Sequence, residues 1–522
     1  MRANEPEVLG LTRRHVETTP DHPAAEDPSR SLTFAELDAE VRAVAASLAG
    51  TGVGEGDRVA LRLANSVDFL VAALACAWLG AIFVPLAAGE PASRLEVILK
   101  SSEPTVVIVP GTPAGDDIAR RTPLPGTYRE LSMVTARLAG ADPPPPLRAA
   151  DRPAYCLYTS GTSGTPKGVL TGQRALAAAV NAVSGRLGLH AGSRGLCVSP
   201  FHFVGSYGTL FPLPVVGGSL VIPPRESLAL PRMFFRILVR ERITHTSFSP
   251  TYLRLLLGSP EIGLLASSSL VTMSLGGEVL TMADLRALWA AAPELKVFNR
   301  YGQTETTIAV TTYRLDRDSL GDATSVPIGP PNPGVRFFVV GDDGRLVEGP
   351  GEVGELYIGG DQLMTGYWRD PELTAAALRS DVVAGETLYR TGDLVYRDEE
   401  GVYFSAGRAD QMVKRSGIRI SLMEVVSALV ALEAVSAAVC LPYDEQGQLG
   451  IVAFVTTSAP SSGQNLRRAL AERLPATMLP DRVEIVEQMP MTLGSKVDER
   501  LLLAQAGLGL PDPAVSPQRR SS

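Results

Sequence analysis

The chain has 522 residues, of which 45% are apolar and 20% are charged. This length exceeds what one hydrophobic core usually organises, so we expect at least two domains with an ordinary globular composition. The net charge of −8 argues against nucleic acid or an anionic membrane as the main partner.

The cysteines Cys76, Cys156, Cys197 and Cys440 lie far apart and form no Cys-x-x-Cys pair. This spacing favours a reduced, cytoplasmic protein without a zinc site or a disulfide framework. The first ten residues contain neither a basic segment nor an apolar run, so they predict no secretory signal.

Strand and helix signals alternate along the first part of the chain. Residues 33–48 and 93–100 have the spacing of amphipathic helices, and Thr33 with Glu36 forms a capping box. Short apolar runs predict buried strands at 58–63, 105–109, 218–222 and 335–340. This alternation predicts an α/β fold with mostly parallel sheets.

Residues 69–88 carry no charge and are numerous enough to span a bilayer. However, Gly80 and Pro85 divide this run into a helix-like part, 69–79, and a strand-like part, 81–85. A buried helix followed by a central parallel strand has the same composition. We therefore predict no membrane span.

The second half of the chain has a different pattern. Residues 335–404 are rich in β signals, with turn sequences at 341–344 and 398–401 that predict hairpins. Helices are predicted at 422–432 and 466–474, and strands at 437–441 and 451–456. We predict a large α/β domain of mixed, mostly parallel sheets with a β-rich subdomain (1–408), a small α+β domain (409–510) and a disordered tail (511–522).

The segment 158–169 is the strongest chemical signal, and reads Tyr-Thr-Ser-Gly-Thr-Ser-Gly-Thr-Pro-Lys-Gly-Val. Its glycines, hydroxyls and Lys167 offer backbone N–H groups, hydroxyl donors and a cation to a polyanion. It is not a Walker A loop, because Gly168 rather than Ser or Thr follows Lys167. We interpret it as a nucleotide triphosphate site. The alternative is a flexible Ser/Gly loop between strands.

Further motifs follow this segment in order: Asn-Arg-Tyr-Gly-Gln-Thr-Glu at 299–305, Tyr-Arg-Thr-Gly-Asp-Leu at 389–394, Gly-Arg-Ala-Asp-Gln-Met-Val-Lys at 407–414 and Gly-Ser-Lys-Val-Asp at 494–498. With segment 158–169, the set resembles the adenylate-forming superfamily. That superfamily comprises acyl- and aryl-CoA synthetases, adenylation domains of peptide synthetases, and beetle luciferase. The resemblance covers roughly residues 10–505.

The resemblance implies that these motifs bind ATP and Mg²⁺. The implied nucleotide ligands are Thr159, Ser160, Gly161, Thr162, Ser163, Lys167, Gly276, Gly277, Glu278, Asn299, Arg300, Tyr301, Gly302, Asp393 and Arg408. Thr304 would contact the α-phosphate, and Glu305 would bind the metal ion, which typically takes one or two protein carboxylates. Asp393 would accept the ribose hydroxyls, although Thr-Gly-Asp is also ordinary turn chemistry.

The resemblance also implies two successive steps. Lys496 would bridge the substrate carboxylate and the α-phosphate, although Ser495 stands where the family usually has glycine. The small domain would then move about Asp410, and the loop around Gly417 would replace Lys496. This movement would admit a thiol of CoA or of phosphopantetheine on a separate carrier protein.

The sequence restricts the acid substrate only in part. Pro-Phe-His-Phe-Val-Gly at 200–205 resembles the Phe-His-x-x-Gly of acyl-CoA synthetases, whereas α-amino-acid-activating relatives carry Phe-Asp there. His202 cannot replace that carboxylate, which disfavours an α-amino acid. We predict that His202 lines the acyl channel or controls thiol entry. The alternative is a hydrogen-bonded core histidine.

Alignment of the motifs predicts an apolar substrate pocket formed by Phe203, Ser247, Met273, Leu275 and Ile308. Arg300 is the exception. If its side chain points inward, it can pair with a second anionic or strongly polar group on the substrate. The alternative is an outward, solvated arginine.

We therefore predict an AMP-forming ligase that activates a small carboxylic acid as an acyl-adenylate and transfers it to a thiol. The predicted catalytic residues are Lys496, His202, Thr304 and Glu305. One alternative is an amide synthetase with an amine acceptor. Another, of a different class, is a non-catalytic nucleotide-binding regulator, against which the presence of Lys167, Glu305, Asp393 and Lys496 argues.

Substitution of Lys496 by alanine is expected to abolish adenylate formation and to leave thiol transfer from a supplied acyl-adenylate intact. Pyrophosphate release and thioester formation would measure the two steps separately. Loss of both steps would contradict the assigned role of Lys496.

Overall fold

The computed structural model describes residues 7–87, 89–110, 128–133, 136, 143–146, 152–160, 166–320, 325–409, 412–415, 418–445, 448–474, 476–491 and 497–509. The chain divides into two compact units. The first comprises residues 1–338 and 357–391, and the second 339–356 and 392–522. The division falls within strands β15 (Val335–Val340), β16 (Gly354–Gly360) and β19 (Leu388–Arg397).

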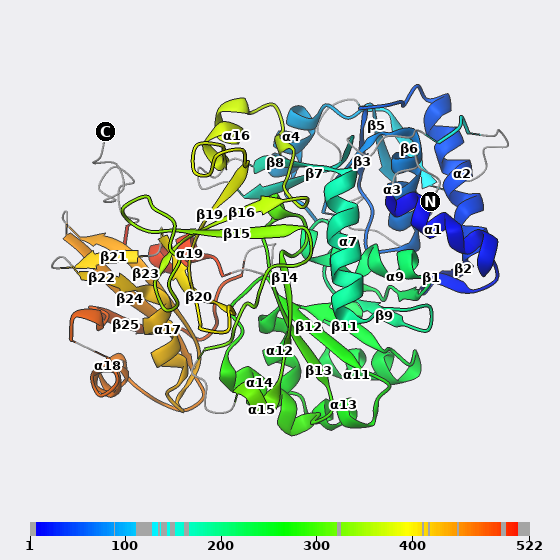
Figure 1. Ribbon diagram of the computed structural model, residues 1–522. Coiled ribbons are helices and arrows are strands. Elements are labelled where there is room, and N and C mark those ends of the chain that lie inside the picture. The colour runs from blue at the N-terminus through cyan, green and yellow to red at the C-terminus, as the bar shows by residue number, and fades with distance from the viewer. Residues whose placement is uncertain are drawn as a thin grey trace. The chain divides into compact units, whose positions relative to one another are not determined.

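The first unit contains a seven-stranded sheet with the strand order β17-β8-β7-β4-β3-β5-β6 (Figure 1). The pairings from β7 through β4, β3 and β5 to β6 are parallel, whereas β7 with β8 and β8 with β17 are antiparallel. Its strands are β3 (Arg58–Leu61), β4 (Ile82–Pro85), β5 (Val106–Val109), β6 (Glu130–Ser132), β7 (Pro153–Ser160), β8 (Pro166–Gly172) and β17 (Gly366–Tyr367).

The first unit also contains an eight-stranded sheet with the order β14-β13-β12-β11-β9-β10-β1-β2. Its pairings are parallel except at the two edges, β1 with β2 and β13 with β14. Its strands are β1 (Pro23–Asp27), β2 (Arg30–Thr33), β9 (Arg194–Cys197), β10 (Ser219–Val221), β11 (His245–Phe248), β12 (Thr272–Gly276), β13 (Lys296–Tyr301) and β14 (Thr311–Leu315).

Helices cover both sheets of the first unit. They are α1 (Glu7–Thr18), α2 (Phe34–Gly50), α3 (Val67–Leu79), α4 (Ala92–Ser102), α7 (Gln173–Leu187), α8 (Tyr207–Leu210), α9 (Pro212–Val216), α10 (Arg225–Leu228), α11 (Pro231–Arg240), α12 (Pro250–Leu257), α13 (Leu264–Ser267), α14 (Met282–Ala291), α15 (Arg317–Leu320) and α16 (Pro371–Ala377). Short 3₁₀ turns are η1 (Val204–Ser206), η2 (Pro260–Gly263) and η3 (Thr304–Thr306).

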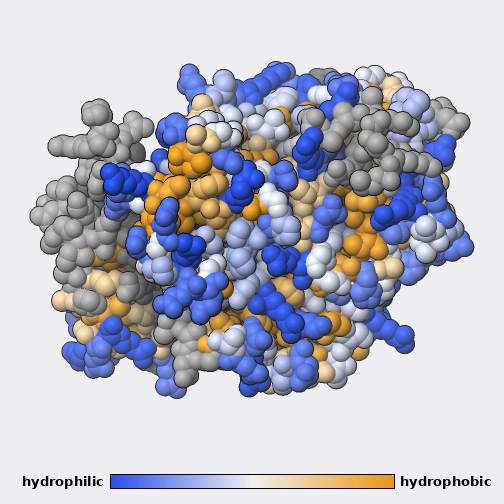
Figure 2. Space-filling model, in the orientation of Figure 1, coloured by the Kyte–Doolittle hydropathy of each residue, from blue (hydrophilic) through white to orange (hydrophobic). Residues whose placement is uncertain are grey.

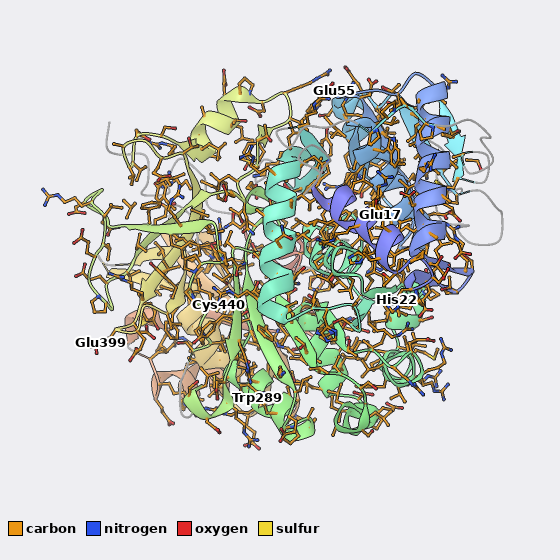
Figure 3. All side chains as sticks on the ribbon, turned by 45° about the vertical axis from the view of Figure 1, so that its right-hand side comes forward. Glu17, His22, Glu55, Trp289, Glu399 and Cys440 are labelled. Atoms are coloured by element: carbon orange, nitrogen blue, oxygen red, sulfur yellow. The ribbon has the colours of Figure 1, made fainter. Side chains whose placement is uncertain are left out.

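One hydrophobic core joins the two sheets. Figure 1 shows α7 between them, and its buried residues Leu176 and Val180 share a core with Tyr155 of β7 and Leu220 of β10. A second core lies between β11–β13 and helices α11, α12 and α14. It includes Phe248, Leu275 and Trp289, the last of which is labelled in Figure 3.

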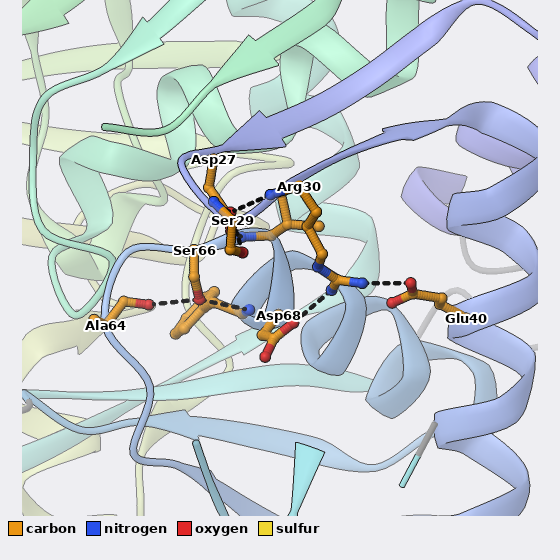
Figure 4. Close-up of polar contacts among 9 residues, drawn as sticks. Asp27, Ser29, Arg30, Glu40, Ala64, Ser66 and Asp68 are labelled. Atoms are coloured by element: carbon orange, nitrogen blue, oxygen red, sulfur yellow. Dashed lines mark hydrogen bonds and ion pairs between the residues drawn. The ribbon is translucent and has the colours of Figure 1, made fainter. Parts of the chain in front are cut away.

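A polar network ties the β1–β2 turn to the two following helices (Figure 4). Asp27 Oδ1 accepts hydrogen bonds from Ser29 N at 2.8 Å and from Ser29 Oγ at 2.6 Å. The Arg30 guanidinium pairs with Glu40 of α2 and, at 2.5 Å, with Asp68 of α3. The network fixes the edge of the eight-stranded sheet relative to the helices of the shared core.

The second unit is a small α+β structure. Its elements beyond β19 are β20 (Tyr403–Arg408), β21 (Met412–Arg415), β22 (Ile418–Ser421), α17 (Leu422–Val430), β23 (Val435–Glu445), β24 (Gln448–Thr457), α18 (Gly463–Ala471), η5 (Ala476–Met478), β25 (Arg482–Ile485) and α19 (Glu499–Gln505). Strand β24 pairs antiparallel with β23 and parallel with β25. Cys440, labelled in Figure 3, is buried in β23.

Most of the elements predicted from the sequence are confirmed. Helix α2 begins at the predicted capping box, where Glu36 N donates to Thr33 Oγ1 at 3.3 Å and Thr33 N donates to Glu36 Oε2 at 2.8 Å. Strand β4 lies between β3 and β7, as expected of a central strand. Helix α3, which contains the first part of the uncharged run, buries every residue except Asp68, which precedes the run. The predicted turns close with Gly344 N donating to Gly341 O at 3.0 Å and Gly401 N to Asp398 O at 3.2 Å.

The predicted domain boundary at 408/409 stays a prediction. The compact second unit already begins at Gly392, because Asp393 of β19 pairs with Arg408 of β20 in one hairpin. Strand β18 (Leu378–Arg379) pairs with the other end of β19, in the first unit. The tail from residue 510 onward lies outside the described residues.

None of the described helices is both long and apolar enough to cross a bilayer. On the face drawn in Figure 2, hydrophilic residues separate the apolar patches from one another. The uncharged run at 69–88 is therefore accounted for by burial of α3 and β4 in the cores of the first unit.

Candidate nucleotide and acid site

The predicted phosphate segment lies where β7 turns back into β8. In this antiparallel pair, Thr159 lies opposite Lys167. Gly161, Thr162 and Ser163 fall outside the described residues, as does the side chain of Ser160. The structure therefore places two of the predicted phosphate ligands, Thr159 and Lys167, at the ends of two paired strands.

Lys167 belongs to a charged cluster with Glu305 and Tyr367. Its Nζ lies 3.0 Å from Glu305 Oε1 and donates to Tyr367 Oη at 2.9 Å. Tyr367 Oη in turn donates to Glu305 Oε1 at 2.8 Å, and the ammonium lies 4.4 Å from the centre of the Tyr367 ring. The buried Glu305 carboxylate is thus held by a cation and a phenol from two other parts of the chain.

Burial, with the negative charge of Glu305 beside it, raises the pKa of Tyr367 well above its usual value. The phenol therefore keeps its proton at neutral pH and remains a hydrogen-bond donor to the carboxylate. Tyr367 was not predicted from the sequence, since a two-residue strand carries no distinctive pattern.

Backbone contacts hold the cluster in register. Trp368 N donates to Gly168 O, Thr365 N to Leu170 O, and Met364 N to Glu305 O, all at 2.7–2.8 Å. A Cβ on Gly168 would lie 2.7 Å from Cys156 Sγ, so glycine is required beside Lys167. The segment carrying Tyr367 is consequently fixed between β8 and Glu305.

The placed residues fit a nucleotide phosphate. Thr159 Oγ1 is buried, and no other described residue is its hydrogen-bond partner, so its donor suits a phosphate oxygen. The described residues include no cluster of three or more metal-ligating side chains. Glu305 therefore fits Mg²⁺ held by one protein carboxylate together with phosphate oxygens, as is typical of that ion.

The motif at 299–305 links β13 to the Lys167 cluster. Asn299 is buried, and its amide donates to Pro327 O at 2.8 Å. Tyr301 is half-buried at the end of β13, and a Cβ on Gly302 would lie 2.8 Å from Ala309 Cα. Thr304 begins η3, one residue before Glu305.

Gln303, which was not predicted, joins this motif to β19 within the first unit. Its Nε2 donates to Thr391 O at 3.1 Å, and its Oε1 accepts from Tyr389 Oη at 2.7 Å. These bonds hold the beginning of the Tyr389–Asp393 motif beside the η3 turn.

The predicted nucleotide ligands at 276–278 lie at the end of β12 and directly after it. A Cβ on Gly276 would lie 2.5 Å from Arg300 O, and Gly277 has a φ of +85°. The Glu278 carboxylate accepts from Thr251 N at 3.0 Å and from Thr251 Oγ1 at 2.5 Å. Thr251 lies in the first turn of α12, so Glu278 stabilises the amino end of that helix.

In the second unit, Asp393 and Arg408 face each other across the β19–β20 pair. Arg408 Nη1 donates to Asp393 Oδ1 at 2.8 Å. Gly392 has a φ of +73°, which allows the turn before Asp393. The predicted residues Asp410, Gly417 and Lys496 lie outside the described residues.

His202 follows β9 on a short loop held by Asn65, whose side chain bonds Ser199 O at 2.9 Å and Phe201 N at 3.0 Å. Burial, together with the smaller effect of the charges of Arg225 and Arg94, lowers the pKa of His202 to about 4. The half-buried Phe203 ring lies 4.5 Å from the imidazole. His202 is therefore neutral at pH 7.

Arg300 points inward, so the alternative of a solvated arginine is wrong. The residue is only 8% exposed, and its Nη2 donates to the buried Ser247 Oγ. A Cβ on Gly208 would lie 2.0 Å from Arg300 Nη1 and 3.2 Å from Ile308 Cγ2. The structure thus brings Arg300, Ser247 and Ile308 together around Gly208.

Met273 and Leu275 lie elsewhere. Both are fully buried in the core that also contains Phe248 and Val297. Ser274 is the register partner of Ser247, and Gly276 is the register partner of Arg300. Because side chains alternate between the two faces of a strand, Ser274 and Gly276 are the β12 residues on the face of Ser247 and Arg300. Met273 and Leu275 therefore lie on the other face of β12 from Arg300 and Ser247, and their place in a substrate pocket stays a prediction.

Thr307 and Ile308 both have positive φ, +54° and +66°. This is an uncommon conformation for β-branched residues, and such strain is often found at functional sites. It directs Ile308 toward Gly208 directly after the η3 turn.

The fold and this site define a nucleotide-binding enzyme with a large and a small unit. The sequence profile of AMP-binding enzymes matches residues 12–368, and that of the AMP-binding enzyme C-terminal domain matches residues 424–496. The chain belongs to the AMP-binding enzyme family. The resemblance to the adenylate-forming superfamily is thereby confirmed.

Individual relatives agree with this assignment. The chain is 34% identical to phenyloxazoline synthase MbtB of Mycobacterium sp. (strain MCS), over 93% of this chain and 41% of that protein. It is 30% identical to IdnL1 over 94% and 99% of the two chains, with a TM-score of 0.71. It is 25% identical to ATP-bound MatB of Rhodopseudomonas palustris over 95% and 98%, with a TM-score of 0.82. The chain spans about two fifths of the length of this synthase and of two other curated relatives that it matches.

The substitution Tyr367→Phe is expected to weaken MgATP binding about 10- to 150-fold, because hydrogen bonds to charged groups contribute about 1.5–3 kcal/mol. The phenylalanine ring would still lie beneath the Lys167 ammonium, so the test isolates the hydroxyl. Calorimetric titration with MgATP would measure the dissociation constant.

Tyr252→Phe is the matched control. It removes a hydroxyl that donates to Leu228 O at 2.7 Å on α12, away from the cluster. This control should lower the free energy of unfolding and leave the MgATP dissociation constant unchanged. Equal affinities in wild type and Tyr367→Phe would refute the role of the hydroxyl.

The pKa of His202 also predicts a pH dependence of stability. Between its ordinary pKa of 6.5 and about 4, unfolded His202 takes up a proton before folded His202 does. The free energy of unfolding should therefore fall as the pH falls through this range. From pH 6.5 to 5.0, wild type should lose about 1–2 kcal/mol more than His202→Gln.

Urea unfolding of both proteins at several pH values would measure this difference. Parallel curves for wild type and His202→Gln would show that the imidazole is protonated equally easily in the folded and unfolded states.

Proposed function

We propose that this chain activates a small carboxylic acid with ATP, releasing pyrophosphate, and transfers the acyl group from the adenylate to a thiol. The observation that carries the proposal is the cluster of Lys167, Glu305 and Tyr367 beside the β7–β8 turn. The cluster presents a cation and a carboxylate at the turn where the sequence predicts that phosphates bind.

The chemistry requires such an arrangement. Attack of a carboxylate on the α-phosphate brings two anions together, and preorganised cations and donors must offset their repulsion. Lys167 supplies the cation and Thr159 a buried hydroxyl, and Glu305 would hold Mg²⁺, which supplies charge neutralisation when bound. Lys496 would supply the second cation, at the reacting carboxylate.

The surroundings of His202 support an acid other than an α-amino acid. His202 is neutral at pH 7, and the charges that act on it are those of Arg225 and Arg94. A substrate ammonium would find no carboxylate in His202 and would be repelled by both cations. This agrees with the absence of aspartate from position 202.

The acceptor step rests on the motifs around Asp410 and Gly417. We propose CoA or the phosphopantetheine of a separate carrier protein as the acceptor, with the small domain moving about Asp410. The four separated cysteines, all free and buried, support a cytoplasmic location.

Pyrophosphate release should depend on a carboxylic acid. A screen of amino, aryl, fatty and dicarboxylic acids with ATP and Mg²⁺ would measure it, followed by thioester assays with CoA and holo carrier protein. Lys167→Ala should lower the rate with the best acid at least about 100-fold, since it removes a charge that offsets phosphate repulsion.

Lys296→Ala is the control for this substitution, because Lys296 is exposed at the start of β13. It should keep the wild-type rate. ATP binding without acid-dependent pyrophosphate release would instead identify a nucleotide-binding regulator, and capture of the acyl group by amines alone would identify an amide synthetase.

A further inference from the structure

The Arg300 guanidinium is buried, and two of its three nitrogen atoms have no hydrogen-bond acceptor among the described residues. Its Nη2 donates to Ser247, whereas Nε and Nη1 are buried and no described residue accepts from them. Among the described residues, no carboxylate lies within ion-pair distance of this side chain. A buried charge that lacks a partner is costly, and proteins retain one mainly where it serves a ligand or an ion pair.

The charge is present at physiological pH. Burial lowers the pKa of Arg300 to about 10, which leaves the guanidinium protonated at pH 7. The side chain therefore remains a cation with free N–H donors in a desolvated place, where a hydrogen bond to an anion is strong.

The residues around Arg300 are small and polar. Ser247 and Ser274 are register partners on β11 and β12, and Gly276 is the register partner of Arg300. Ser274 Oγ is also buried, and no described residue is its partner. Gly208 lies against the guanidinium, where any larger residue would collide with Nη1. Small side chains thus line the face of the sheet that carries the Nε and Nη1 donors of Arg300 and the hydroxyl of Ser274.

The same chain segment connects Arg300 to the adenylation chemistry. Arg300 lies on β13, which leads through Gly302 into the η3 turn that carries Glu305. Ile308, directly after this turn, comes back to Gly208 beside the guanidinium. An acid whose reacting carboxylate lies near Glu305 can therefore extend its other end toward Arg300.

We infer that Arg300 binds a second carboxylate of the acid substrate, so that this chain selects dicarboxylic acids. The inference rests on the proposed function and specifies its substrate class. The Nε and Nη1 donors and the Ser274 hydroxyl are the groups that meet the second carboxylate.

The test compares each dicarboxylic acid with the monocarboxylic acid of equal chain length. Suitable pairs are succinate with butanoate, glutarate with pentanoate, and isophthalate with benzoate, with pyrophosphate release as the readout. For at least one pair, kcat/KM should favour the dicarboxylic acid about 10- to 150-fold, as expected for hydrogen bonds to a charged group.

Arg300→Met should abolish this preference by lowering kcat/KM for the dicarboxylic acid to that for its monocarboxylic partner, and cooperative urea unfolding of the variant would report folding. Arg254→Met is the matched control, because Arg254 pairs with Asp284 at 2.9 Å on the other face of the sheet and should leave the preference intact. Gly208→Ala keeps the cation but pushes it aside, and should reduce the preference even if Arg300→Met does not fold.

If, in every pair, kcat/KM for the monocarboxylic acid equals or exceeds kcat/KM for the dicarboxylic acid, the inference is overturned. The proposed function would remain supported in that case, because an acid still drives pyrophosphate release. If no acid supports pyrophosphate release, the proposed function fails, and calorimetry with the dicarboxylic acids and a non-hydrolysable ATP analogue decides the inference. Binding that Arg300→Met removes would support it, whereas absence of binding, or binding unaffected by Arg300→Met, would overturn it.

Discussion

The ion pair between Lys167 and Glu305 is the interaction on which the site depends. The lysine comes from the start of β8 and the glutamate from η3, and Tyr367 from a third segment donates to the same carboxylate oxygen. A cation and an anion held this way stay in place before any substrate arrives, so little reorganisation is required when phosphate binds. The two sheets of the first unit share one core, and this core gives the pair a rigid frame.

Close backbone approach makes this frame possible. Gly168, Gly276 and Gly302 each lie where a Cβ would be under 3 Å from a neighbouring atom. At these positions, glycine is required by contact with another chain segment rather than by flexibility. The motifs are therefore recognisable in the sequence because the backbone beside the predicted phosphate and adenosine contacts leaves no room for side chains.

Local signals predicted the fold well and the acid pocket less well. The capping box at Thr33, the buried helix before Gly80 and the strand after Gly80 all depend on neighbouring residues, which a sequence displays directly. Tyr367 could not be found this way, because its partners are 62 and 200 positions away. The β12 residues predicted for the pocket lie on the face away from Arg300 and Ser247, since motif alignment locates the strand but the face of each side chain depends on its exact register.

Register also explains why the substrate choice depends on Arg300. Moving the pocket from Met273 and Leu275 to Ser274 and Gly276 replaces two large apolar side chains with two small ones. A pocket lined by Met273 and Leu275 would place the Arg300 guanidinium beside apolar side chains. The observed face instead carries guanidinium N–H groups and a serine hydroxyl that have no hydrogen-bond partner among the described residues. The charge of Arg300 is therefore not balanced by any carboxylate among the described residues. A ligand that brings its own negative charge is the simplest means of balancing it.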